Sequence, residues 1–149
     1  MPYFTRQVAP NGGLVVVATI GVSQARRAAL VAANQEIPNG VAIQGLIDTG
    51  ASNTCVDPSA LTQLNLTPTG TTQINTPSTG TQPTAALTYD VSLTIAAMAG
   101  HPPFVFNTIP VIQSELQVVQ GIQALIGRDV LRFCLLTYDG RNGLFSLAY

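Results

Sequence analysis

The chain has 149 residues, which suits one domain with a sizeable core, and we expect a single domain over residues 1–149. Apolar residues make up 46% and charged residues only 9%, so the composition excludes a disordered tail. The formal net charge is −1, and this lack of a basic excess argues against a nucleic acid or an anionic membrane as a partner.

The first predicted elements follow an arm over residues 1–13, which proline and glycine punctuate. The apolar run at 14–22 is too short to span a bilayer, and its β-branched content predicts a core strand rather than a signal peptide. The chain has only two cysteines, which we expect to be free thiols. Together with the expected lack of a signal peptide, they indicate a cytoplasmic protein. A turn signal at 36–40 predicts that strands over 26–35 and 41–48 form a hairpin. The alanine content of 26–35 leaves a helix as the alternative.

The middle and end of the chain also consist mainly of short predicted strands. A short helix is predicted at 58–64, where Asp57 can cap the first turn and Pro58 suits it. Turn formers between strand formers predict a hairpin at 74–85, followed by an alternating, half-buried strand at 87–95. Further strands are predicted at 104–111, 124–127, 135–139 and 144–149, with a turn or short helix at 114–122 and a helix of one to two turns at 128–133. Many short strands without an internal repeat predict an all-β fold, either a small closed barrel or a sandwich.

Two short motifs carry the chemistry. In LIDTGAS, from Leu46 to Ser52, a carboxylate follows an apolar strand, and Thr and Gly can then form a tight loop with backbone donors aimed at it. Asp-Thr-Gly also makes an ordinary turn, so alone it is a weak signal. The second motif, LIGRDVL from Leu125 to Leu131, combines two apolar residues, a glycine and a predicted short helix.

Together these motifs resemble those of the retropepsins, the homodimeric aspartic proteases of retroviruses, retroelements and some bacterial proteins. LIDTGAS matches their active-site motif and LIGRDVL their second motif. The strand that leaves the flap in these enzymes is similar to residues 89–93, and the closing strand of bacterial members is similar to residues 143–147. The resemblance spans about residues 14–149. It implies a small closed acid-protease barrel with a flap hairpin, and an aspartic endopeptidase that needs no metal or other cofactor.

The chain contains only one Asp-Thr-Gly, so the resemblance implies that a second copy of the chain supplies the other Asp48. The two carboxylates would share one proton while one of them activates a water. Thr49 is expected to hydrogen-bond the loop of the partner, and Gly50 to offer its carbonyl to the substrate backbone. Ala51 stands where some members carry a hydroxyl, which predicts activity at mildly acidic to near-neutral pH.

The second motif is expected to support this loop. Gly127 should allow a close crossing of two segments. Arg128 pairs with an acid in retroviral enzymes, but Ser52 occupies that place here, which leaves Asp129, Asp57 or backbone carbonyls as its partner. Asp129 is expected to act as a cap or as a hydrogen-bonding residue.

The resemblance also suggests a peptide-binding groove. Its expected residues are Gly50 and Ala51, a wall residue at Val111 (beside Ile112), and the flap tip at Pro77, Ser78, Thr79 and Gly80. The flap could close over an extended peptide, although an ordinary surface hairpin and, for Val111, a plain core position are the alternatives. The alternative functions are a dimeric module that holds a peptide without cutting it, and a subunit that dimerises only when concentrated.

Overall fold

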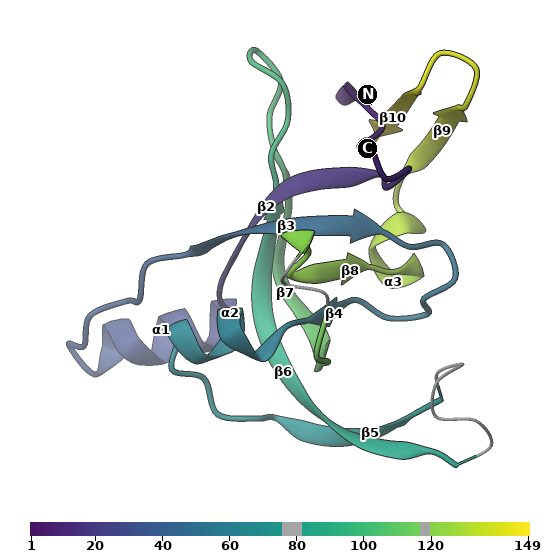
Figure 1. Cartoon of the computed structure of the whole chain (residues 1–149). Helices are drawn as coiled ribbons and strands as arrows, with labels where there is room; N and C mark the ends of the chain where they lie inside the picture. Colours follow the sequence, from purple (N-terminus) through teal and green to yellow (C-terminus); the bar gives the residue numbers. More distant parts are fainter. Residues whose placement is uncertain (76–81, 117–119) are drawn as a thin grey trace.

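A computed structural model describes residues 1–75, 82–116 and 120–149, and it shows a small barrel of six strands (Figure 1). The strands follow one another around the barrel in the order β2 (Val15–Val22), β3 (Val41–Ile47), β8 (Ala124–Ile126), β4 (Cys55–Val56), β7 (Phe104–Gln113) and β6 (Thr84–Ile95). Pairing of β6 with β2 closes the ring, and β5 (Gly70–Ile74) extends the sheet beyond β6. The predicted closed all-β barrel is therefore confirmed.

The barrel core is filled by every second side chain of its long strands. β2 buries Val16, Ala18, Ile20 and Val22, while Val17 and Thr19 are exposed. A period of two is what a strand requires when one of its faces packs on a core. The alternation predicted for 87–95 likewise holds for β6 from Tyr89 onward, but Leu87, near the free end of the strand, is exposed.

The two ends of the chain form a separate three-stranded sheet. β10 (Leu144–Ala148) lies between β1 (Tyr3–Gln7) and β9 (Leu135–Asp139), which places both termini together (Figure 1). The buried rings of Phe4 and Phe145 meet edge to face, with their centroids 6.4 Å apart, and join the core. The predicted terminal hairpin is thus confirmed, and the arm at 1–13 contains a strand that its proline and glycine content concealed.

The predicted strand at 26–35 is wrong, because this segment forms helix α1 (Gln24–Ala32). The Oγ of Ser23 accepts a hydrogen bond from the Arg26 amide and caps the helix. The turn signal at 36–40 does not join a hairpin, since β3 pairs instead with β2, from Val15 opposite Leu46 onward. Only Leu30 of α1 is buried, and the alanine content that left a helix as the alternative favours the observed helix.

The two shorter helices lie where the sequence predicted them. In α2 (Pro58–Gln63), the carboxylate of Asp57 caps the helix and Pro58 occupies its first turn. The helix α3 (Arg128–Leu131) is one turn long and follows β8 directly. Within the described ranges, no helix is long and apolar enough to cross a membrane.

The hairpin predicted at 74–85 is present up to its described ends. β5 and β6 pair antiparallel from Gly70 opposite Thr88 to Ile74 opposite Thr84. The expected flap tip, Pro77, Ser78, Thr79 and Gly80, lies outside the described residues. The structure therefore gives the two arms of this hairpin.

Candidate active site

Asp48 begins the loop that follows β3. Its Oδ1 accepts hydrogen bonds from the Gly50 amide at 2.8 Å and the Ala51 amide at 3.3 Å. Its own amide donates to the Ile126 carbonyl at 3.0 Å. Asp48 is half-buried, while Thr49 and Gly50 are exposed, so the loop presents its tip to the surface and holds the carboxylate by backbone donors.

Gly50 has a steric reason to lack a side chain. A Cβ at this position would lie 3.1 Å from the Asp48 Oδ1, which is tighter than ordinary van der Waals contact. A larger residue would therefore push against the carboxylate. Glycine at this place keeps both the turn and the position of the Asp48 side chain.

The second motif crosses directly beside this loop. β8 runs parallel to β3, with Ile126 opposite Ile47, and the chain then passes Asn53 at Gly127. A Cβ on Gly127 would lie 2.5 Å from the carbonyl carbon of Asn53 and 2.9 Å from the Thr54 nitrogen. Backbone atoms cannot yield as a flexible side chain does, so the crossing needs glycine for space rather than for an unusual φ.

Arg128 binds the back of the Asp48 loop. Its Nη1 donates to the Thr49 carbonyl at 2.7 Å and the Gly50 carbonyl at 3.2 Å, and its Nη2 donates to the Ser52 Oγ at 2.8 Å. The Arg128 amide also donates to the Ala51 carbonyl at 2.9 Å. Of the partners left open by the sequence, the structure thus gives backbone carbonyls. Ser52, which replaces the acid of retroviral enzymes, is an additional partner.

Asp129 joins the second motif to Thr54, a residue that the sequence analysis did not single out. The Thr54 amide and hydroxyl donate to the two Asp129 oxygens at 2.9 and 2.8 Å, and the Gly127 amide donates to the Thr54 Oγ1 at 3.2 Å. Thr54 is fully buried, so these bonds satisfy polar groups that water cannot reach. The loop and the second motif therefore form one hydrogen-bonded unit.

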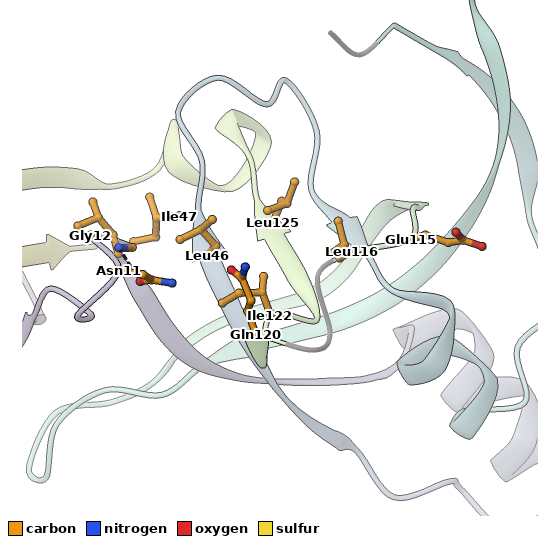
Figure 2. Close-up of a pocket in the computed structure, with 11 residues that line it drawn as sticks. Asn11, Gly12, Leu46, Ile47, Glu115, Leu116, Gln120, Ile122 and Leu125 are labelled. Carbon is orange, nitrogen blue, oxygen red and sulfur yellow. Dashed lines mark hydrogen bonds between the residues drawn. The ribbon is translucent and has the colours of Figure 1, made fainter. Parts of the chain in front are cut away.

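A cavity of about 600 Å³ lies against the strand end that leads into Asp48 (Figure 2). Its walls come from four separate stretches of the chain: 11–14, 46–47, 115–116 and 120–125. Most of the surface is apolar, from Leu14, Leu46, Ile47, Leu116, Ile122 and Leu125, with Asn11, Glu115 and Gln120 among the polar lining residues. Val111 does not line this cavity; it is 1% exposed and belongs to the barrel core, which is the plain alternative for that position.

Cys55 is the thiol nearest to this chemistry. Burial raises its pKa, and the nearby charges of Asp129 and Asp48 raise it further. Because the thiolate is the reactive form of cysteine, this environment keeps Cys55 as an unreactive thiol. The site therefore presents the side chain of Asp48 rather than a reactive thiol.

Comparison with known proteins identifies the class to which this fold and site belong. The aspartyl protease family model matches residues 31–130, a range that includes both motifs, and the chain belongs to that family. The crystal structure of a retropepsin-like aspartic protease from Rickettsia conorii is similar over 99% of this chain and 91% of that chain, with a TM-score of 0.63 and 18% identity. The retropepsin-like fold predicted from the two motifs is thereby confirmed.

A second solved structure is more distant. The crystal structure of the retroviral protease-like domain of Ddi1 from Leishmania major is similar over 85% of this chain and 82% of that chain, with a TM-score of 0.39 and 14% identity. A comparison with curated proteins gave no match.

Proposed function

We propose that the protein is an aspartic endopeptidase that works as a homodimer, with one Asp48 from each chain in the catalytic pair. The observation that carries this proposal is the Asp48 loop itself. Its carboxylate is held by two backbone amides, and Arg128 holds the loop from behind. One chain provides one such loop, and a two-fold axis brings identical loops together.

The proposed reaction needs one charged and one protonated Asp48. The charged carboxylate takes a proton from a water, whose oxygen attacks the carbonyl carbon of the substrate peptide bond. The protonated carboxyl hydrogen-bonds the carbonyl oxygen as negative charge develops there. When the C–N bond breaks, a carboxyl proton passes to the leaving amine, and the pair again holds one proton.

The neighbouring residues have supporting roles in this proposal. The exposed Thr49 hydroxyl hydrogen-bonds the loop of the partner, and the Gly50 carbonyl accepts a hydrogen bond from the substrate backbone. That carbonyl also accepts from Arg128 at 3.2 Å, but a carbonyl oxygen has two lone pairs and can accept both. Gly127, Arg128 and Asp129 position the loop, and none of them touches the reacting atoms.

An exposed apolar segment supports the second copy. Phe133, Leu135 and Tyr138 are 54%, 62% and 60% exposed, and they follow α3, which carries the Arg128 that holds the Asp48 loop. β9 is an edge strand of the terminal sheet, and exposed large apolar side chains along such an edge favour a protein partner. We propose that association of two chains covers this segment.

The cavity beside Asp48 suits a large apolar side chain of an extended peptide substrate. Its volume of about 600 Å³ lies within the range of small-molecule sites, and six aliphatic side chains line it. The β5–β6 hairpin, which we propose as the flap, would cover the bound peptide. Gly50 and Ala51 would contact the backbone of the bound peptide.

The test is cleavage of unfolded casein by the wild type and Asp48→Asn over a range of pH and enzyme concentration. We expect the wild type to cut, Asp48→Asn to be inert, and the specific activity to fall on dilution. Glu36→Gln is the control, because it makes the same change from carboxylate to amide at an exposed residue between α1 and β3. Excess Asp48→Asn chains should suppress the wild type by forming mixed dimers. Cleavage by Asp48→Asn at the wild-type rate would refute the mechanism, and an inert wild type that binds peptide would favour the binding module.

A further inference from the structure

Asp57 makes a contact that helix capping does not require. The side chain is 5% exposed, and its Oδ1 caps α2 by accepting the Ser59 amide at 2.9 Å. Its Oδ2 accepts the Leu116 amide, also at 2.9 Å, from a residue 59 positions away. Burial raises the pKa of Asp57, but the hydrogen bonds from Ser59 and the Leu116 amide outweigh burial and lower it. The buried group is therefore a carboxylate with a donor on each oxygen.

The second contact reaches the wall of the apolar cavity. Leu116 lines that cavity beside Glu115, as Figure 2 shows. The chain on either side is also bonded to residues 56 and 57, since the Ser114 amide donates to the Val56 carbonyl at 3.1 Å and the Asp57 amide to the Gln123 carbonyl at 2.9 Å. Among these three bonds, the one to Leu116 is made by a side chain, so a substitution can remove it.

We infer that Asp57 is a positioning residue for substrate selection, which holds the Leu116 wall of the cavity at the distance that a large apolar side chain fills. This inference rests on the proposed function. A pocket prefers a large side chain over a small one only when its walls stay in contact with the large one. Release of Leu116 widens the cavity and removes that preference, while the Asp48 loop keeps its own hydrogen bonds.

Two substitutions separate the wall contact from the cap. In Asp57→Asn, the amide oxygen can still accept the Ser59 N–H, but the amide nitrogen then faces the Leu116 N–H, and two donors cannot bond. In Asp57→Ser, the hydroxyl caps α2 and is too short to reach Leu116 as well. Asn and Ser are as good as Asp at the N-cap, so both variants keep the helix. Glu36→Gln, at an exposed residue between α1 and β3, is the control.

The experiment compares peptides that carry Phe or Ala at the cleaved position. We expect both Asp57 variants to lose about tenfold of the Phe-over-Ala preference in kcat/KM, mainly through KM for the Phe peptide. The kcat for the Ala peptide should stay near the wild-type value. A role in stability alone would lower activity on both peptides equally. Hydrogen exchange of the Leu116 amide gives a second measurement, and it should be slow in the wild type and Glu36→Gln but faster in both Asp57 variants.

The outcomes separate the two proposals. If the wild type cleaves and both Asp57 variants keep the full preference, the inference is overturned and the proposed function stands. If the wild type cleaves no peptide, the proposed function fails, and the inference is judged by Leu116 exchange and by the affinity for the same peptides. Unchanged exchange and unchanged relative affinity would then overturn it too.

Discussion

Replacement of Gly127 by alanine should damage both stability and activity, because the new methyl group meets backbone. Its Cβ would lie 2.5 Å from the Asn53 carbonyl carbon and 2.7 Å from its oxygen, so the two crossing segments must move apart. Such overpacking costs about 2 kcal/mol. The shift also weakens the bonds that join Thr54 to Gly127 and Asp129, which adds about 1 kcal/mol for each of two bonds. The expected loss is therefore about 4 kcal/mol.

Thermal unfolding followed by circular dichroism measures this loss. For a chain of this size, about 4 kcal/mol corresponds to a fall in Tm of about 12 °C. Casein cleavage should fall by more than about 100-fold even at temperatures where the variant is folded, because the Asp48 loop loses its support. Gly70→Ala is the control, since its Cβ would meet only the Thr88 hydroxyl, at 3.2 Å, and that side chain can rotate. A Gly127→Ala variant with the wild-type Tm would refute the close crossing.

Three further predictions follow from the same contacts. Arg128→Ala should lower the rate of casein cleavage by about tenfold or more, while the Tm changes little because the hydrogen bonds of Arg128 are exposed. Arg128→Lys should restore little of the activity, since lysine lacks the planar guanidinium fork. Full activity of Arg128→Ala would contradict the positioning role. The pKa of Asp57 is lowered on folding, so its contribution to stability is present above the unfolded pKa of about 3.9 and is lost as the pH falls through the lower folded pKa. The free energy of unfolding in urea, measured from pH 6 to pH 2, should therefore depend less on pH in Asp57→Asn than in the wild type. Parallel pH curves for the two proteins would contradict this. Burial raises the pKa of Cys134 to about 11, so iodoacetamide should modify it far more slowly in the folded than in the unfolded protein at pH 8.5, as mass spectrometry can measure, and equal rates would contradict this burial.

The sequence predicted those features that depend on neighbouring residues. The strand before Asp48, the helix that Asp57 caps and the terminal hairpin were all found, because periodicity, capping and turn formation act over a few positions. At α1 two local signals conflict: the alanine content favours a helix and the turn signal at 36–40 favours a hairpin, and the fold follows the alanine content. Motif resemblance supplied the closed barrel, which local patterns alone left as a choice between barrel and sandwich.

The contacts of the site that escaped prediction share a different property. Thr54 meets Asp129 across 75 positions, and Asp57 meets Leu116 across 59. Neither pair has a local pattern, since a buried threonine and a helix cap look ordinary in sequence. The apolar cavity likewise needs four stretches of the chain, so only the folded barrel could assign its walls.

The pairing of β3 with β8 also has a consequence for the order of events during synthesis. Asp48 leaves the ribosome long before Arg128. Arg128 lies 79 positions after Thr49, whose carbonyl it binds. Pairing across such a separation forms slowly, because the intervening chain must first be closed into a loop. A growing chain therefore carries the Asp48 loop without its support until the segment with Arg128 is made. A peptidase assembled in this way would stay silent while it is being translated.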